Sequence, residues 1–257
     1  MKSHKLIAVD TVDKRNLYLL SQLRQDGYNA IEFDSITNLD NPIILLLSPN
    51  SPIKYINLAK GSAIFCGKIE PDLLEELEDK SIKVFKYFDD KKLSIRNAQL
   101  TAEGALADII LNTPDSLLFS KILIIGNGKV ACAMAKMLRR NTCKPDVLAR
   151  NCKLEDKIRV YCNEVFSFED DLDLKKYSAI VNTVPSLVLD SKLNCVSKNC
   201  YILDLASKPG GVNFKLALSL GLKVHHYLGI PGTITPKIAA TYIKQSVLEI
   251  CKREKYL

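Results

Sequence analysis

Short apolar runs alternate with stretches of helical spacing along the first part of the chain. The runs lie at residues 6–9, 30–33, 43–47, 63–66 and 82–85, and each has the length of a buried strand. Leucines recur at helical spacing between Leu17 and Leu23, and again after Pro71. Strands that alternate with helices form parallel sheets, so this pattern predicts a small α/β domain over residues 1–98.

A second series of strands and helices follows. A helical pattern over residues 97–112 ends before Pro114, and we expect residues 99–117 to connect two domains. Further strands are predicted at residues 122–125, 146–150, 178–182, 201–204 and 222–226. The last helix is expected to begin at Pro236, with Thr235 as its N-cap, and to cross back to the first domain.

The predicted fold class is therefore α/β, with two Rossmann-like parallel-sheet domains separated by a cleft. The first domain takes residues 1–98 and is completed by about 236–257. The second domain, residues 118–235, is the expected nucleotide-binding domain.

The strand at residues 122–125 runs directly into a Gly-x-Gly-x-x-Ala turn that opens a helix. Gly126 allows the tight turn, and Gly128 has no Cβ, so a pyrophosphate could approach the backbone there. The first N–H groups of the helix and its dipole also favour phosphate. The candidate cofactor-binding residues are Gly126, Asn127, Gly128, Lys129 and Val130. The alternative is a plain structural turn.

The next predicted strand, residues 146–150, ends in a basic residue. Enzymes that use NAD commonly place Asp or Glu here, where it binds the ribose 2′-hydroxyl. In this chain Arg150 and then Asn151 stand at that position. Because a guanidinium attracts a 2′-phosphate that a carboxylate would repel, the sequence favours NADP as the cofactor over NAD. An exposed arginine after a strand is the alternative.

Polar residues follow two later strands of the second domain. In chain order they are Asn182, Thr183, Pro185, Asp204, Ser207 and Lys208. The first four are candidate contacts of the cofactor, since loops at sheet ends carry function. Lys208 could pair with a substrate carboxylate or stabilise developing charge. Ordinary turn chemistry is the alternative for this loop.

Four more candidates lie outside the second domain. Asp13 and Arg15 follow the first strand, at an edge where ligands of parallel sheets gather, and the Arg15 fork matches a carboxylate. Thr101 and Glu103 lie near the start of the connecting helix and could face the cleft. The alternatives are a helix N-cap with a solvated arginine, and an ordinary helix start in which the dipole favours Glu103.

The composition changes this picture little. Of the 257 residues, 25% are charged and 47% are hydrophobic, which is ordinary for a globular protein. The net charge of +7 comes with scattered lysines, which indicates solvated faces or an acidic substrate or partner. No basic run is interleaved with aromatic residues, so we expect no nucleic-acid partner. No apolar run reaches the length of a membrane span and no secretory signal is evident, so we expect a cytoplasmic protein with no membrane partner.

The cysteines and histidines suggest no metal site. The eight cysteines are scattered, with no Cys-x-x-Cys pair and no histidine at metal-ligand spacing, which fits a reducing compartment. His225 and His226 are adjacent in a predicted strand and should face opposite sides of the sheet. Only one of them could therefore reach the cleft.

Five blocks of the chain together resemble the family of the dipicolinate synthase A subunits, and they keep its order and spacing over nearly the whole chain. The blocks are residues 97–104, the Gly126 turn, and residues 182–186, 204–211 and 229–237. The most specific are residues 204–211, and residues 229–232 together with Pro236 and Lys237. There are departures, since Thr11 and Val12 replace two glycines that the family has after the first strand, and Ala131 replaces another.

The resemblance implies an NADP-dependent oxidoreductase of sporulating bacteria, located in the cytoplasm of the mother cell. With a small flavoprotein-like B subunit, it would oxidise a dihydrodipicolinate-type cyclic dicarboxylate from the lysine pathway to dipicolinate. Such a substrate needs cations, for which Arg15, Lys208 and Lys237 are the candidates. Asp13, Thr101 and Ser207 are further candidates for substrate binding. Glu103 is the candidate base, with Lys208 as the second catalytic residue.

Two alternatives stay open. One is another NADP-dependent two-domain dehydrogenase of the shikimate type, although the chain lacks the Asn-x-Thr-x-Pro-x-Lys motif of those enzymes. The other is a non-catalytic nucleotide-binding scaffold for a catalytic partner. The form of the substrate, a homo-oligomeric state and activity without the B subunit also stay open.

Overall fold

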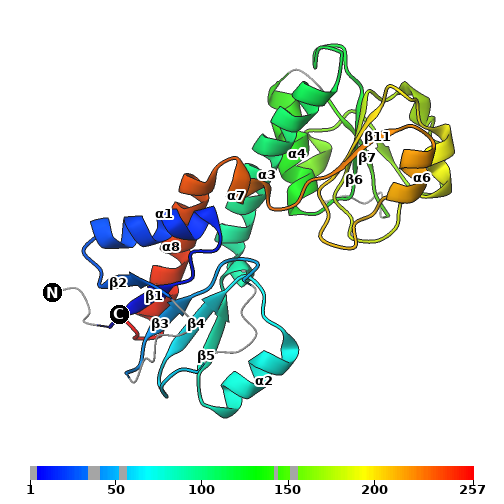
Figure 1. The fold of residues 1–257 in the computed structure, drawn as a ribbon. Coiled ribbons are helices and arrows are strands. Elements are labelled where there is room, and N and C mark those ends of the chain that lie inside the picture. Colours follow the sequence, from blue (N-terminus) through cyan, green and yellow to red (C-terminus); the bar gives the residue numbers. More distant parts are fainter. Residues whose placement is uncertain (1–4, 34–40, 52–56, 142–143, 151–155) are drawn as a thin grey trace. The chain divides into compact units, whose positions relative to one another are not determined.

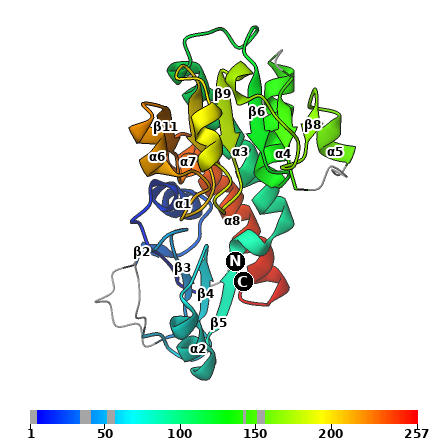
Figure 2. The ribbon, with the colours of Figure 1, turned by 90° about the vertical axis from the view of Figure 1, so that its right-hand side faces the viewer.

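The chain forms two compact units. The structure is a computed structural model that describes residues 5–33, 41–51, 57–141, 144–150 and 156–257 (Figures 1 and 2). The first unit combines residues 1–97 with residues 231–257, and the second unit takes residues 98–230. Each unit has its own parallel sheet and its own buried cores.

The first unit is built on a sheet in which the described strands are all parallel. They are β1 (Ile7–Val9), β2 (Ala30–Glu32), β3 (Ile44–Leu46), β4 (Ala63–Cys66) and β5 (Lys83–Lys86). Their order is β2-β1-β3-β4-β5, and every predicted apolar run forms one of them. The strand order reverses between β1 and β3, and ligands of open parallel sheets bind at the carboxyl ends of the strands at such a point.

Helices cover both faces of this sheet. On one face, α1 (Lys14–Gln25) and α8 (Pro236–Arg253) share a core with side chains of β1 and β3. The buried residues of α8, among them Ile243 and Val247, thus bring the end of the chain into the first unit. On the other face, α2 (Pro71–Asp79) buries Leu73 and Leu77. The short helix η1 (Tyr87–Asp89) follows β5.

The second unit has the larger sheet, and its described strands are again all parallel. They are β6 (Ile122–Ile125), β7 (Asp146–Leu148), β8 (Val165–Phe166), β9 (Ala179–Asn182), β10 (Tyr201–Asp204) and β11 (Lys223–His226). Their order is β11-β10-β9-β6-β7-β8, which is the Rossmann order, with its reversal between β6 and β9. The predicted class of two parallel-sheet α/β domains is confirmed.

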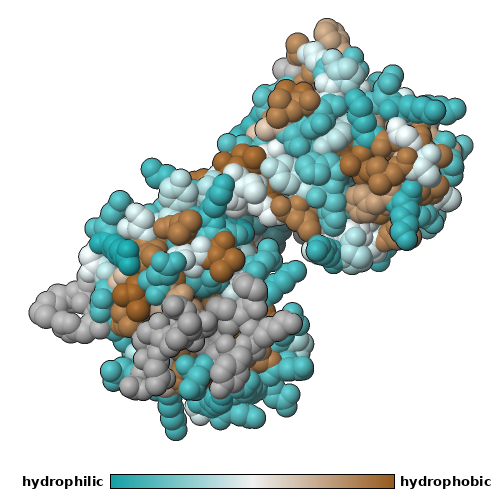
Figure 3. Space-filling model, in the orientation of Figure 1, coloured by the Kyte–Doolittle hydropathy of each residue, from teal (hydrophilic) through white to brown (hydrophobic). Residues whose placement is uncertain are grey.

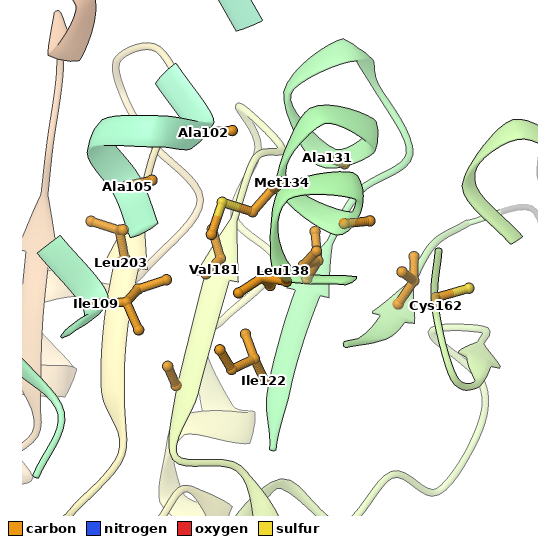
Figure 4. Close-up of a cluster of buried hydrophobic side chains, with 14 of the residues drawn as sticks. Ala102, Ala105, Ile109, Ile122, Ala131, Met134, Leu138, Cys162, Val181 and Leu203 are labelled. Carbon is orange, nitrogen blue, oxygen red and sulfur yellow. The ribbon is translucent and has the colours of Figure 1, made fainter. Parts of the chain in front are cut away.

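The helices of the second unit also lie on both faces of its sheet. The unit's part of α3 (Lys91–Asn112), α4 (Lys129–Arg140) and α5 (Asp156–Arg159) lie on one face. Figure 4 shows side chains of α3 and α4, among them Ile109 and Met134, over strands that carry Val181 and Leu203. The short elements α6 (Phe214–Ser219), η2 (Leu174–Lys176) and η3 (Ser191–Cys195) cover the other face. The one-turn helix α7 (Ile230–Thr233) follows β11.

Three details differ from the sequence-based expectation. Helix α3 begins at Lys91 rather than near Asn97, because Asp90 accepts the Lys92 N–H (2.8 Å) and starts the helix earlier. Strand β8 and helix α6 were not predicted, since both are too short to show a periodic pattern. Thr235 is the N-cap residue of α8, but its side chain makes no capping hydrogen bond with a described residue.

Among the described residues, no helix has both the length and the apolar character that crossing a membrane would require.

Candidate functional site

The turn after β6 is shaped by one glycine in a conformation that few other residues adopt. Gly126 has φ of +115°, and a Cβ added there would lie 2.3 Å from the Thr183 Oγ1 atom. Thr183 in turn donates its hydroxyl proton to the Ile125 carbonyl (2.8 Å), across the point where the strand order reverses. Gly126 and Thr183 therefore form one packed unit, in which the threonine shapes the turn from the neighbouring strand.

The start of α4 lies open beside this turn. Gly128 is the N-cap residue with φ of −76°, and a Cβ placed there would meet nothing within 4 Å. No side chain of the described residues caps the first turn of α4. Asn127, Gly128 and Lys129 are exposed, and Val130 is half-buried. A helix N-terminus with open space above its first backbone N–H groups can receive an anionic group such as a phosphate.

The polar side chains after β9 and β10 bind each other. Asn182 donates to the Asp204 carboxylate (2.8 Å) and accepts the Val184 N–H (3.1 Å). The Asp204 carboxylate also accepts the backbone N–H groups of Ala206 (3.0 Å) and Gly211 (2.7 Å). Asn182 and Asp204 are both fully buried, so they shape the two loops rather than face a ligand in this structure. Their predicted direct contact with the cofactor stays a prediction.

The loop held by Asp204 presents Ser207 and Lys208 to solvent. Both are exposed, the Lys208–Pro209 peptide bond is cis, and His226 Nε2, carrying its proton, donates to the Ala206 carbonyl (2.8 Å). The Lys208 amine makes no hydrogen bond or ion pair with a described residue. Pro185, in the neighbouring loop, is also exposed. The loop thus offers an accessible cation on a backbone that buried groups fix.

The remaining candidates of the second unit are dispersed. Glu103 is exposed on α3, and Thr101, two residues earlier in the same helix, is half-buried. Arg150 is exposed just beyond β7, as an arginine that meets a 2′-phosphate would have to be. Asn151 lies outside the described residues. The structure brings together Gly126 with Thr183, and Asn182 with Asp204, whereas no hydrogen bond or ion pair joins Glu103 to Lys208 within the part of the chain that it describes.

In the first unit, Asp13 and Arg15 form an internal pair. Asp13 caps α1 by accepting the Arg15 backbone N–H (2.8 Å), and its two carboxylate oxygens accept Nε (2.8 Å) and Nη2 (2.7 Å) of the guanidinium. Burial alone would raise the pKa of Asp13, but the hydrogen bonds and charge of Arg15 outweigh it and hold this pKa below its ordinary value of 3.8. Arg15 is only 4% exposed, so its role in substrate binding stays a prediction.

Gly232 packs directly against this guanidinium. A Cβ at Gly232 would lie 2.9 Å from Arg15 Nε and 3.1 Å from Cζ. The last candidate, Lys237, is exposed in the first turn of α8. The segment that precedes α8 therefore packs against Arg15 through Gly232, and Lys237 follows in the first turn of α8.

Sequence comparison finds a curated relative, and no family model matches the chain. The A subunit of dipicolinate synthase from Bacillus subtilis (strain 168) is 29% identical over 164 residues, which are 61% of this chain and 54% of that protein. The match thus spans about half the length of the relative. The chain resembles the A subunit of dipicolinate synthase. The resemblance inferred from the sequence blocks is confirmed.

Solved structures of the same subunit from two bacteria share the fold over the whole chain. The protein from Bacillus halodurans has a TM-score of 0.85 at 20% identity, covering 97% of this chain and 98% of that chain. The protein from Bacillus subtilis has a TM-score of 0.84 at 22% identity, covering 100% and 98%. A D-isomer specific 2-hydroxyacid dehydrogenase from Lactobacillus delbrueckii ssp. bulgaricus, solved in an NAD-complexed form, has a TM-score of 0.55 at 12% identity, covering 98% and 96%.

The sequence did not single out Asp10, Ser48 and Tyr87, which lie in the predicted substrate domain. The Asp10 carboxylate accepts the backbone N–H of Val12 (3.0 Å) and of Ser48 (3.2 Å), which joins the loops after β1 and β3. Tyr87 donates to the Leu47 carbonyl (3.2 Å), and burial raises its pKa well above its usual value. The sequence does contain a signal for two of them, since Asp10 and Ser48 each follow directly after a predicted apolar strand, at the edge of the sheet where polar residues of neighbouring loops can meet.

The two adjacent histidines face opposite sides of the second sheet, as predicted. His225 lies near Asp108 and Tyr201, with Nδ1 3.3 Å from the Asp108 carboxylate and 3.2 Å from the Tyr201 hydroxyl, which itself donates to Asp108. His226 stacks on Phe214 with ring centroids 5.2 Å apart. Of the two, His226 is bonded to the loop that carries Lys208.

Proposed function

We propose that this chain is an NADP-dependent oxidoreductase that converts a dihydrodipicolinate-type cyclic dicarboxylate to dipicolinate. The observation that carries the proposal is the open turn between β6 and α4, at the reversal point of a sheet with Rossmann strand order. The likeness to the A subunit of dipicolinate synthase supports the choice of substrate class. The NAD-complexed form of a dehydrogenase with a related fold supports a nicotinamide cofactor.

The residues at this turn fit a dinucleotide. The space above Gly128 and the uncapped start of α4 suit a pyrophosphate, because the backbone N–H groups and the helix dipole both favour an anion. The exposed Arg150 beyond β7 suits a 2′-phosphate, which favours NADP over NAD. When bound, the nicotinamide ring would accept the hydride that the substrate loses.

The chain's own residues would bind and orient the dicarboxylate and take up its proton. Oxidation to the aromatic ring removes a hydride from one ring atom and a proton from a neighbouring one. The exposed Lys208 amine would pair with a substrate carboxylate, and the Asp204 network would keep the loop in place. Glu103, which is exposed on α3, would accept the proton. Aromatisation favours the forward direction, so positioning and charge neutralisation are the main tasks.

A second protein and a place in sporulation belong to the same proposal. The relative is named as a subunit, which suggests that this chain too acts with a partner, and we propose the small flavoprotein-like B subunit. The resemblance further suggests the cytoplasm of a sporulating mother cell and a substrate drawn from the lysine pathway.

Titration with nucleotides tests the cofactor assignment. We expect NADP to bind at least about tenfold more tightly than NAD, and Arg150→Ala to remove most of that preference by weakening NADP alone. Arg139→Ala is the matched control, because it removes the same charge from the exposed far end of α4. Equal affinity of the wild type for the two nucleotides, or no binding of either, would contradict the assignment.

Turnover assays with dihydrodipicolinate, NADP and the B subunit test the reaction. We expect Lys208→Ala to lower kcat/KM by about a hundredfold, while NADP affinity stays within about twofold. NADP binding with no turnover, with or without the B subunit, would favour the scaffold alternative. Equal loss of nucleotide binding and turnover in Lys208→Ala would argue that this lysine belongs to the cofactor site.

A further inference from the structure

The first unit carries an open pocket of about 450 Å³ at the start of α8. Its walls come from Tyr18 of α1, from Ile234 and Thr235 before α8, and from the first turns of α8. The size lies within the range of pockets that bind small molecules. All of these residues belong to the first unit, so the pocket is complete within it.

One part of the pocket is apolar and includes an aromatic ring. Tyr18, Ile234 and Ile238 line it, and they are 42%, 46% and 38% exposed, so their side chains are accessible to a ligand. Figure 3 shows apolar side chains gathered over α1 and α8 on one face of this unit. An aromatic ring beside branched aliphatic side chains provides a surface on which a flat ring can stack.

The other part of the pocket is cationic. Lys237 is exposed in the first turn of α8, and no Asp or Glu is among the described residues that line the pocket. The Thr235 hydroxyl is buried, and it has no hydrogen-bond partner among the described residues. The N-terminal end of an 18-residue helix adds partial positive charge at the same place. A carboxylate entering the pocket would thus meet an ammonium group and a helix N-terminus.

Hydrogen bonds join α1 and α8, the two helices that contribute side chains to the pocket. Gln22 donates to the Lys237 carbonyl (3.1 Å), and Thr241 donates to the Gln22 side chain (3.2 Å). The two helices also share a buried core. The helix backbones that carry Tyr18 and Lys237 are therefore held relative to each other before any ligand binds, which lowers the entropic cost of binding.

We propose that this pocket binds a small planar carboxylate, with the ring against Tyr18 and the carboxylate at Lys237. The inference deepens the proposed function and rests on it for the identity of the ring, since dipicolinate is a flat aromatic dicarboxylate. It places Lys237 in a pocket together with Tyr18 and Thr235, and it assigns all three residues to ligand binding. An aliphatic dicarboxylate of equal charge lacks the flat ring and binds more weakly.

Calorimetric titration of the full chain with dipicolinate, without nucleotide, tests the pocket. We expect Tyr18→Ala and Lys237→Met each to raise the dissociation constant about tenfold or more, and Thr235→Val to raise it about threefold. Lys252→Met is the matched control, because it removes an exposed lysine from the other end of the same helix and should change the constant less than twofold. Glutarate should bind at least about tenfold more weakly than dipicolinate.

The outcomes separate this inference from the proposed function. Dipicolinate affinity that stays unchanged in both Tyr18→Ala and Lys237→Met would overturn the pocket, as would no binding to the wild type, or glutarate binding as tightly as dipicolinate. Wild-type turnover with NADP and the B subunit is measured separately. Turnover with unchanged binding in the variants rejects the pocket alone, whereas dipicolinate binding that depends on Tyr18 and Lys237, without turnover, rejects the reaction alone.

Discussion

Single buried polar residues decide the shape of the loops in which the candidate ligand groups lie. Asp204 is fully buried and accepts three hydrogen bonds, from Asn182, Ala206 and Gly211. The sequence predicts Asp204 at the end of a strand, where the structure has it, and in contact with the cofactor, which stays a prediction. Residue type and position alone do not show whether a carboxylate points outward or inward. Only the fold shows that the Asp204 carboxylate is buried and bonded to the backbone of its own loop.

Replacing Asp204 by Asn should destabilise the protein. The change puts an amide N–H₂ group where an oxygen now accepts a backbone N–H, so one buried donor loses its partner, at a cost of about 2 kcal/mol in the free energy of unfolding. Urea unfolding followed by circular dichroism measures this free energy. Asp190→Asn is the control, since Asp190 is exposed and its carboxylate accepts a hydrogen bond from the Asn213 side chain (2.7 Å) rather than from a buried backbone N–H group. A control loss as large as that of Asp204→Asn would contradict the argument.

Cys200 should make stability depend on pH above pH 9. Burial raises the pKa of its thiol from 9.0 to about 12, so the unfolded chain loses this proton at a lower pH than the folded chain does. The contribution is intact below pH 9 and is lost as the pH rises toward 12, at about 1.4 kcal/mol per pH unit.

Urea unfolding of Cys200→Ala and wild type between pH 9 and pH 10 measures this slope. Because the unfolded thiol is only half ionised at pH 9, the slope averaged over this range should be shallower in the variant by about 1 kcal/mol per pH unit. Cys195→Ala, at an exposed cysteine, serves as the control. Identical slopes for wild type and Cys200→Ala would show that the thiol does not ionise differently in the two states.

At the scale of elements, the turn between β6 and α4 separates two roles of glycine. Gly126 is required by the fold, since φ is positive and Thr183 occupies the space of a Cβ. Gly128 has an ordinary φ and open space around it, so the fold itself would accept a side chain there. The strand–turn–helix unit was predictable from sequence because four apolar residues, two glycines and a helical pattern follow each other without interruption.

Alanine substitutions at these two glycines should change different quantities. Gly126→Ala should lower the stability, and Gly128→Ala should mainly weaken nucleotide binding. Gly126→Ala should cost about 3 kcal/mol of unfolding free energy, because it adds both a strained conformation and a clash. Gly128→Ala should cost less than about 1 kcal/mol yet raise the NADP dissociation constant about tenfold. Thermal unfolding and nucleotide titration of both variants measure the two quantities. A stable Gly128→Ala protein with unchanged NADP affinity would argue against phosphate binding at this turn.

Elements without a strong repeat could not be predicted. Strand β8 has two residues and helix α6 has six, so neither shows enough positions to reveal a period. The joint between the loops after β1 and β3, made by Asp10 and Ser48, depends on strand order, which the sequence pattern alone does not give. Fully apolar strands such as β6 and longer, capped helices such as α1 were predictable, because an unbroken apolar run or a repeated helical spacing marks their whole length.

At the scale of the whole molecule, the two units differ in whether they are built from one or from two segments of the sequence. The second unit is one continuous segment, residues 98–230, whereas the first unit needs both residues 1–97 and residues 231–257. The core shared by α1, β1 and α8 shows why, since Ile243 and Val247 of α8 pack with Ile7 and Leu19. The sequence predicted the two-domain class through its two series of alternating strands and helices.

The two units should therefore respond differently to truncation. Residues 98–230 expressed alone should fold, with a cooperative urea transition seen by far-UV circular dichroism. Residues 1–230, which lack α8, should keep that transition but lose protection of residues 1–97 from limited proteolysis. A protected first segment in the 1–230 chain would show that α8 contributes little to the first unit.

The place of α8 in the first core has a consequence for synthesis on the ribosome. Residues 1–97 cannot complete their core until α8 has been synthesised, because Ala240, Ile243 and Val247 emerge only after all of the second unit. The second unit can thus complete its sheet while the nascent N-terminal strands still expose the apolar face that α8 will cover. Residues 1–97, although translated before the second unit, should therefore complete their core after it, and until then their exposed apolar face is open to aggregation or to a chaperone.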